Sequence, residues 1–365
     1  MRVALVAAAT THHDDTDRTR RVRRLAELLR EDGHDVVVCC ARWWGGEVSR
    51  FETDGLAYRA VADEPRGDAF AARLPVVLPA VAPDVVCVVH DRPTHVLGAR
   101  LGAAFARAPL VVDWYDVRDP DGAEGLVPRL RAVARDRAEF LASRVPERIV
   151  APSRLVRRRV YELSARDGGV EVVPNAIDFD RITATDPVEA ADVVLSGRLD
   201  ADANVESLLL ALAELREFGW RALVVGDGPM RERYERQARD LRIDDRVSFA
   251  GDLSLDERIA RFRGAHVCVH TAARTPFPTD LLWALACGCA GIVEYRADSA
   301  AHELVERWDR GFLATGDEEL SAYLREAADL ERKDVEERFA DYDEERVLEE
   351  YERVFADARD SFGPI

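Results

Sequence analysis

Two glycines that follow an apolar run could bring the backbone close to a ligand. In "VVGDGP" (224–229), Gly226 and Gly228 lie between a strand-like run and a helix-like stretch. Glycine permits close backbone approach, and amides at the start of a helix bind anions. Arg198 occupies the same position one apolar run earlier, in "SGRL" (196–199), and a guanidinium fits the paired oxygens of a diphosphate. The pattern indicates a phosphate-binding edge, although a tight turn would use the same glycines.

The stretch "TPFPTDLLWALACG" (275–288) combines a stiff loop with the start of an apolar helix. Two prolines flank Phe277, and Thr279 and Asp280 precede a run of Leu, Trp and Ala that ends at Gly288. The first turn of a helix favours negative charge because of the helix dipole. We expect the prolines to aim this helix N-terminus at an anion, with an ordinary capped core helix as the alternative.

Short apolar runs alternate with helix-like stretches along most of the chain. The runs at 84–89, 110–115 and 148–153 predict parallel strands joined by crossover helices. The alternation restarts after a polar stretch near 178–190. We predict an α/β protein with two Rossmann-like, doubly wound domains that face a central cleft, with ligands at the carboxyl ends of the strands. The expected domains are 1–180 and 181–340, followed by a helical tail, 341–365, that could pack back on the first domain.

The composition is acidic and almost free of lysine. The 365 residues include 69 Asp and Glu against 51 Lys and Arg, a net charge of −18, and Lys333 is the single lysine. An acidic surface repels phosphates, so nucleic acid is not an expected partner. An Ala- and Val-rich, acidic composition is typical of a high-salt cytoplasm and a GC-rich genome, and we expect an origin in a halophilic archaeon.

The cysteines and the first residues predict a cytoplasmic location for the chain. The six cysteines lie in or beside apolar runs with no metal-binding or haem spacing, which predicts buried, reduced thiols: Cys39, Cys40, Cys87, Cys268, Cys287 and Cys289. The start, "MRVALVAAAT", leads into a charged stretch with no cleavage site, and we interpret it as a first strand.

The order of motifs after residue 148 resembles a known family. The series "SRLVRRRV", "VEVVPNAID", "SGRLDADANVESLLLAL", "LVVGDGP", "DDRVSFAGDL" and "PFPTDLLWALACG" resembles the C-terminal half of retaining GT-B glycosyltransferases of the group 1 type, family 4. The N-terminal half fits the architecture with weaker motifs. The resemblance implies a C-terminal domain that binds a nucleotide-sugar donor and an N-terminal domain that binds the acceptor. It also implies that no metal and no cofactor are required, because helix-terminal amides can neutralise the diphosphate.

The resemblance implies a set of donor-binding residues: Gly197, Arg198, Gly226, Asp227, Gly228, Pro229, Phe277, Pro278, Thr279 and Asp280. Several usual donor contacts are replaced in this chain. Thr275 and Trp283 stand at the positions of two glutamates, and Ala203 stands where a lysine follows the "GRL" arginine. Pro278 replaces a glycine and has no N–H to donate. Trp283 could stack under a base or fill the core.

Asp280 has two possible roles at the start of the helix. Its carboxylate favours the helix dipole but would repel a diphosphate at the same place. It could turn towards sugar or ribose hydroxyls, or it could cap the helix and leave the donor site impaired. Together with Arg198 and His90, it is an expected catalytic residue.

On the acceptor side, polar residues close the first strands of the N-terminal half. The candidates are His12, His13, His90, Asp91, Asp113, Tyr115 and Asp116. His90 matches a histidine found at this strand end in the family, and Tyr115-Asp116 stands where a second would be. An aspartate there could orient an acceptor hydroxyl or act as a base. A hydrogen-bonded strand-end residue is the alternative for each.

Arginines crowd the stretch from Arg18 to Arg24, a local reversal of charge sign. The stretch is either a solvated helix face or a patch that contacts a phosphate-bearing lipid acceptor or the inner face of the cell membrane.

The sequence therefore predicts a glycosyltransferase of the hexosyltransferase class, moving a sugar from a nucleotide donor to a glycan or lipid-linked acceptor with retention. The alternatives are a non-catalytic GT-B module that binds a glycan or a partner enzyme, and a GT-B nucleotide-sugar epimerase.

Overall fold

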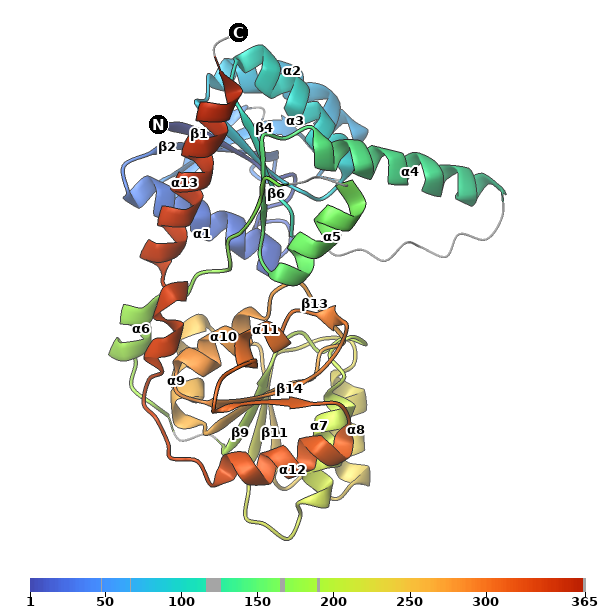
Figure 1. Ribbon diagram of the computed structural model, residues 1–365, viewed down its shortest axis with the longest axis vertical. Coiled ribbons are helices and arrows are strands. Elements are labelled where there is room, and N and C mark those ends of the chain that lie inside the picture. Colours follow the sequence, from blue (N-terminus) through green and yellow to red (C-terminus); the bar gives the residue numbers. More distant parts are fainter. Residues whose placement is uncertain (47, 66, 116–125, 165–167, 189–190, 364–365) are drawn as a thin grey trace. The chain divides into compact units, whose positions relative to one another are not determined.

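The chain forms two compact units (Figure 1). The structure, a computed structural model, describes all residues except 47, 66, 116–125, 165–167, 189–190 and 364–365. Unit 1 comprises Met1–Pro174 and Glu345–Ile365, and unit 2 comprises Asn175–Glu344. The division follows Pro174 rather than residue 180, because Ile177 forms a β-bridge with Asp343 and donates its amide to the Tyr342 carbonyl at 2.9 Å.

Unit 1 is built on one sheet with the strand order β3-β4-β2-β1-β5-β6-β7-β8. The strands are β1 Arg2–Val6, β2 Asp35–Ala41, β3 Arg50–Thr53, β4 Leu56–Ala62, β5 Val85–Val89, β6 Leu110–Asp113, β7 Arg148–Ala151 and β8 Val170–Val172. The pairings are parallel except for the β3–β4 hairpin. Asp54 and Gly55 turn this hairpin with positive φ, as an Asp-Gly pair favours. The alternation of apolar runs and helices did not predict this edge hairpin.

The helices of unit 1 are α1 Asp17–Glu31, α2 Asp68–Val81, α3 Pro93–Ala106, α4 Leu126–Arg144, α5 Arg154–Ser164 and α13 Glu344–Phe362. Right-handed crossovers place α2, α3, α4 and α5 on one face of the sheet, where consecutive helices contact one another. Helices α2 and α3 pack closely at two glycines of α3. A Cβ on Gly98 would lie 2.4 Å from the Ala71 carbonyl oxygen, and a Cβ on Gly102 would lie 2.7 Å from the Leu74 carbonyl oxygen, so larger residues at these positions would force the helices apart.

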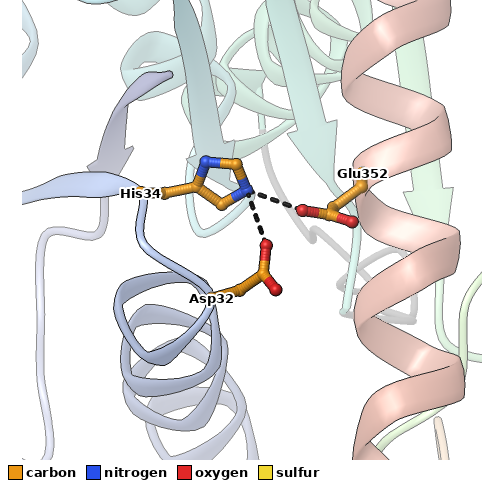
Figure 2. Close-up of side chains that lie close together, drawn as sticks. All are labelled: Asp32, His34 and Glu352. Atoms are coloured by element: carbon orange, nitrogen blue, oxygen red, sulfur yellow. Dashed lines mark hydrogen bonds and ion pairs between the residues drawn. The ribbon is translucent and has the colours of Figure 1, made fainter.

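The C-terminal helix α13 packs on unit 1. It buries an apolar side that includes Tyr351 and Phe355. His34 Nε2 at the start of the β2 region lies 2.6 Å from Glu352 Oε1 and 3.5 Å from Asp32 Oδ2 (Figure 2). These contacts attach the end of the chain to its beginning.

Unit 2 contains a parallel sheet with the order β11-β10-β9-β12-β14-β16. Its strands are β9 Val193–Ser196, β10 Ala222–Val225, β11 Val247–Gly251, β12 Val267–His270, β14 Ala290–Glu294 and β16 Gly311–Ala314, and a separate short pair is formed by β13 Arg274–Thr275 and β15 Asp298–Ser299. The helical segments are α6 Phe179–Ala184, α7 Val205–Glu214, α8 Arg231–Asp240, α9 Leu255–Gly264, α10 Thr279–Ala286, α11 His302–Val305, α12 Asp317–Ala328 and η1 Glu337–Tyr342.

Both units therefore have the doubly wound α/β architecture expected from the alternation of apolar runs and helices. The central strands of both sheets are fully buried, as parallel strands covered by helices on both faces must be. All six cysteines are buried and unbonded, and burial raises the pKa of Cys39 to about 12, so these thiols are inert core residues.

Candidate functional site

The central strands of the unit 2 sheet end side by side. Ser196 closes β9, Val225 closes β10, His270 closes β12 and Glu294 closes β14. Because parallel strands share the edge at which they end, the residues after them gather at one rim. The candidate donor residues of the sequence analysis, including Arg198, lie on this rim.

The glycines after β10 are required by contact with the loop after β9. A Cβ on Gly226, which has φ +117°, would lie 2.0 Å from the Gly197 carbonyl oxygen, and one on Gly228 would lie 2.3 Å from that of Leu199. The Gly226 amide donates to the Gly251 carbonyl, and the Gly228 amide donates to the Asp227 carboxylate at 2.7 Å. These amides are thus engaged within the protein, which differs from the expected ligand-facing role. Asp227 and Pro229 are exposed beside them.

Arg198 follows Gly197 and extends into solvent. Its side chain is 72% exposed, and its nearest acid is Asp200, with 3.6 Å between Arg198 Nε and Asp200 Oδ2. An exposed pair at this separation contributes little binding energy. The guanidinium is therefore available to a ligand that approaches the rim.

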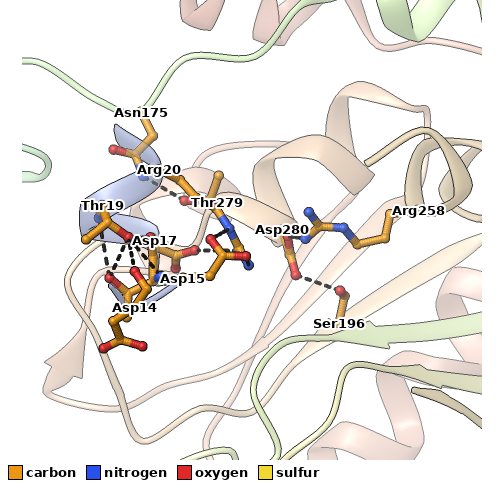
Figure 3. A network of polar contacts seen from close by, with 11 residues as sticks. Asp14, Asp15, Asp17, Thr19, Arg20, Asn175, Ser196, Arg258, Thr279 and Asp280 are labelled. Carbon is orange, nitrogen blue, oxygen red and sulfur yellow. Dashed lines mark hydrogen bonds and ion pairs between the residues drawn. The ribbon is translucent and has the colours of Figure 1, made fainter. Parts of the chain in front are cut away.

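Helix α10 begins at this rim with its first turn partly buried. Pro278 is the N-cap residue, and the Thr279 amide donates to the Phe277 carbonyl at 3.1 Å. Asn175 Nδ2 donates to Thr279 Oγ1 at 2.7 Å, which fixes the Thr279 side chain (Figure 3). Phe277 is 4% exposed and belongs to the core. A direct ligand contact by Phe277 is therefore not favoured.

Asp280 is held by two donors from neighbouring elements (Figure 3). Ser196 Oγ donates to Asp280 Oδ2 at 2.6 Å, and Arg258 Nη1 donates to Asp280 Oδ1 at 2.6 Å. No hydrogen bond among the described residues joins this side chain to a backbone amide of α10, so the capping alternative is not observed. The Arg258 guanidinium instead compensates the carboxylate, which lowers its repulsion of an anion at the helix N-terminus.

The residues that replace the usual two glutamates and the lysine make contacts within the protein. Trp283 is 6% exposed and packs in the core, as one of its two alternatives predicted. Ala203 is nearly buried, and its carbonyl accepts a hydrogen bond from Thr271 Oγ1. Thr275 Oγ1 lies 3.3 Å from His270 Nε2. Burial lowers the pKa of His270 to about 4, so this imidazole is neutral at neutral pH.

His270, Glu294 and Arg258 are rim residues that the sequence analysis missed. Glu294 is 4% exposed, accepts from Asn204 Nδ2 at 2.8 Å and pairs with Arg296, and burial raises its pKa. The rule that selected His90, a polar residue that closes a predicted strand, would also have selected His270 and Glu294. No sequence signal identifies Arg258, because only the fold brings it to Asp280.

In unit 1, the loop after β1 carries an aromatic stack. The exposed His12 ring lies on Trp43, with 3.6 Å between centroids and an interplanar angle of 3°. His13 Nδ1 accepts from the Thr10 amide, and its buried Nε2 has no partner among the described residues. Burial lowers the pKa of both histidines, with further lowering from Arg23 on His12 and from His12 on His13. Both rings are therefore uncharged donors or stacking surfaces at neutral pH.

His90 is more deeply buried than we expect for a residue that contacts an acceptor. It is 4% exposed and stacks on Trp114 at 3.8 Å, and its Nε2 lies 2.8 Å from Glu139 Oε2. Asp91 forms an ion pair of 3.0 Å with Arg18. Tyr115 is also buried. Asp116 lies outside the described residues.

Asp113 forms a buried network instead of an open strand-end site. Its Oδ2 accepts from Arg21 Nε at 2.9 Å and from the Tyr351 hydroxyl at 2.8 Å, and it is 1% exposed. Arg21 also donates to the carbonyls of Val173 and Pro174. Burial alone would lower the pKa of Arg21, but the Asp113 carboxylate raises it. Asp113 thus joins α1, β6 and α13, a structural role in place of the predicted acceptor contact.

The arginines of α1 do not form a patch of free cations. Arg21 is buried, and Arg20 pairs with Asp15 and Asp17. Ion pairs also join Arg23 and Arg24 to Glu27. The membrane-facing role predicted for this helix is therefore not supported, because nearby carboxylates cancel its charge.

Two further features of unit 1 lie apart from these strand ends. The ligand atoms of Asp32, His34 and Glu352 fall within 4.8 Å of one another, a spacing that could hold a metal ion, but the same contacts already serve to attach α13 (Figure 2). A cavity of about 390 Å³ is lined by Arg2, Val37, Arg50, Arg59 and Val81, among others, near the amino ends of β1 and β2.

Each of the two units is built on a Rossmann-like sheet, the architecture of the GT-B class. Residues 178–346 match the family described as glycosyl transferases group 1, and residues 19–181 match glycosyltransferase family 4. The two matches meet near the boundary of the units and together span both of them. The chain belongs to the group 1, family 4 glycosyltransferases.

Solved structures with the same fold align over almost the whole chain. A glycosyltransferase from Rickettsia africae is 13% identical, with a TM-score of 0.78 and 98% of each chain covered. The lipopolysaccharide outer core galactosyltransferase WaaB is 15% identical, with a TM-score of 0.73, and covers 98% of this chain and 99% of its own. Anabaena HepE, solved with UDP and glucose, is 18% identical, with a TM-score of 0.65, and the alignment covers 99% of this chain and 95% of HepE.

A curated relative matches over a shorter region. The 2-deoxystreptamine glucosyltransferase of Streptomyces kanamyceticus is 33% identical over 111 residues, 26% of this chain and 29% of the relative. The match therefore spans less than a third of that protein. Among the described residues, none of the helices has both the length and the apolar character needed to cross a bilayer.

Proposed function

We propose that the protein transfers a hexose from a nucleoside diphosphate sugar to a hydroxyl of a glycan or lipid-linked acceptor, with retention of anomeric configuration. The observation that carries this proposal is the exposed Arg198 guanidinium at the strand-end rim of unit 2. The bond from the anomeric carbon to the diphosphate oxygen breaks, and a bond to the acceptor oxygen forms. The electron pair leaves with the diphosphate, and the hydroxyl proton is released.

The first turn of α10 adds a second group that favours a diphosphate. Among the described residues, the amides of Asp280 and Leu281 have no backbone acceptor, so they can donate to a phosphate oxygen. Arg258 offsets the Asp280 carboxylate, which would otherwise repel that anion. The carboxylate oxygens of Asp280 can accept further hydrogen bonds besides those from Ser196 and Arg258. We propose that sugar or ribose hydroxyls donate these bonds.

The relatives suggest which donor to test first. Anabaena HepE has been solved with UDP-glucose, and the Streptomyces relative is a glucosyltransferase. UDP-glucose is accordingly the first donor to offer. We propose that transfer needs no metal ion, because the amides at the start of α10 and Arg198 can neutralise the diphosphate. For the acceptor we assign the loop of His12 and His13 in unit 1, whose uncharged rings suit a sugar or another neutral group.

The test compares kcat/KM of the Arg198→Ala variant with that of a control variant at another exposed arginine of unit 2. Arg233 on α8 is 61% exposed and pairs with Glu206, so Arg233→Ala is the control. We expect Arg198→Ala to lower kcat/KM by about 10²–10³-fold, as the loss of a charge-stabilising donor does. Arg233→Ala should keep kcat/KM within about twofold, since a surface substitution away from the site has little effect.

Three results would overturn the proposal in different ways. Unchanged kcat/KM for Arg198→Ala would remove Arg198 from the site. Failure of the folded protein to bind any nucleoside diphosphate would favour a non-catalytic GT-B module. Turnover of the nucleotide sugar without an acceptor, giving an isomeric nucleotide sugar, would favour an epimerase.

A further inference from the structure

Helices α2 and α3 of unit 1 expose large apolar side chains in one region. Val76 on α2 is 75% exposed, and Leu101 and Phe105 on α3 are 56% and 68% exposed. Single exposed apolar residues are common on protein surfaces, but a cluster of them marks an interaction site. These three residues define the outer face of the helix pair, called here the α2–α3 face.

The three side chains lie at the same level of the two helices. Gly98 lies against Ala71, and Gly102 lies against Leu74, so the helices run in the same direction with matched levels. Leu101 and Phe105 are one turn apart on α3, and Val76 lies in the corresponding turns of α2. Figure 1 shows α2 and α3 side by side on one face of the unit 1 sheet. Leu101 and Phe105 thus lie together on the exposed side of α3, and Val76 lies at a similar level on the exposed side of α2.

The charge of this region is the opposite of the rest of the chain. The full sequence holds 69 acidic residues, yet residues 69–83 and 92–112 contain neither Asp nor Glu. They contain four arginines, Arg73, Arg92, Arg100 and Arg107. Arg100 pairs with Glu147, whereas Arg73 and Arg107 are exposed and have no acidic partner among the described residues. Arg73 Nη1 also donates to the Val61 carbonyl at 3.4 Å. The α2–α3 face therefore combines exposed apolar groups with two cations for which the described residues offer no acidic partner.

We propose that the α2–α3 face docks on an anionic lipid surface. Phe105, Leu101 and Val76 enter the boundary between headgroups and acyl chains, and Arg73 and Arg107 contact lipid phosphates. Apolar insertion and electrostatic attraction to anionic lipid act together in such contacts. The proposal replaces the arginines of α1 as the membrane contact, because carboxylates pair with those arginines, whereas no carboxylate of the described residues pairs with Arg73 or Arg107.

The test is flotation of the full chain with vesicles, in a buffer where circular dichroism shows the native fold. We expect binding to vesicles of equal parts phosphatidylglycerol and phosphatidylcholine, and weak binding to pure phosphatidylcholine. The double variant Arg73→Gln/Arg107→Gln should lower the partition coefficient about tenfold or more, from roughly 1 kcal/mol per basic residue near the surface. Leu101→Gln/Phe105→Ser should lower binding to both vesicle types.

Matched controls separate this face from other surfaces. Phe218 of unit 2 is 55% exposed, and Phe218→Ser should leave binding unchanged. Arg20→Gln/Arg24→Gln removes two arginines of α1 and should also leave it unchanged. The proposal fails if the folded protein ignores anionic vesicles, or if the α1 pair, and not the α2–α3 variants, abolishes binding. Light scattering that shows a dimer, dissociated by Leu101→Gln/Phe105→Ser without any vesicle binding, would assign the face to a second copy.

Discussion

The two units have the same architecture, but the candidate residues selected from the sequence differ in exposure between them. In unit 1, Asp113 and His90 are almost fully buried, and each is bonded to another part of the same unit. In unit 2, Arg198 is exposed, and Asp280 is held open at the rim by two neighbours. Arg198 is therefore the stronger functional candidate, because its guanidinium is exposed and its pair with Asp200 is long.

The largest expected effect concerns the buried network of unit 1. Asp113→Ala leaves the Arg21 guanidinium buried without its anion, and we expect the free energy of unfolding to fall by about 3–5 kcal/mol. Denaturant unfolding measures this directly. The double variant Arg21→Met/Asp113→Leu replaces both charges with apolar groups and should be much less destabilised. Equal loss in both variants would show that packing, not charge pairing, holds α1 and α13 on the sheet.

The next effect concerns the compensated carboxylate of unit 2. Arg258→Ala leaves Asp280 facing the diphosphate without its cation, and we expect UDP affinity to fall about 10–100-fold, the loss of a charged hydrogen bond worth about 1.5–3 kcal/mol. Calorimetric titration measures the affinity. Adding Asp280→Asn to Arg258→Ala should restore part of the loss, because it removes the repulsion. No restoration would mean that Arg258 contacts the ligand itself.

A smaller effect tests whether the glycine loop is structural. Gly226→Ala would place a Cβ 2.0 Å from the Gly197 carbonyl oxygen at a positive φ, and we expect about 1–3 kcal/mol of destabilisation. Gly219→Ala, which meets no atom within 4 Å, is the control and should change stability little. A stable Gly226→Ala protein that no longer binds UDP would return this loop to a ligand-contacting role.

The smallest effect is on acid stability and involves both units. Burial lowers the pKa of His95 in unit 1 and of His270 in unit 2 to about 4, below the unfolded value of 6.5. The unfolded chain therefore binds protons more readily, and stability is lost as pH falls from 6.5 towards 4. Each histidine should cost about 1 kcal/mol between pH 7 and pH 5.5. His95→Gln should flatten the pH profile of unfolding, and an unchanged profile would contradict this cause.

The fold could be predicted from the sequence because alternating apolar runs and helices leave few arrangements for parallel strands. The β3–β4 hairpin was missed although Asp54-Gly55 signals it, because β3 is short, has no buried residue and carries a weak apolar pattern.

The positions of the candidate site residues could be predicted only in part. Arg198 follows directly from its place after a strand, whereas the partners of Asp280 come from β9 and α9, far away in sequence. For Arg21 a local signal was present but overlooked. Arg21 was grouped with the other arginines of α1, although it lies four residues before Leu25 on the buried side of that helix. The helical period therefore indicated that Arg21 is buried. Tertiary pairing, not local pattern, decides which charges remain free.

The most direct test of the unit 2 site is calorimetric titration of UDP into the wild-type protein and Arg198→Ala, in salt that keeps both folded. We predict saturable binding to the wild type and a loss of affinity of about tenfold or more in the variant, since charge-assisted bonds to phosphate are strong. Equal affinities would contradict the assignment of Arg198 to the diphosphate. The absence of binding to both proteins would contradict a nucleotide-sugar site at this rim.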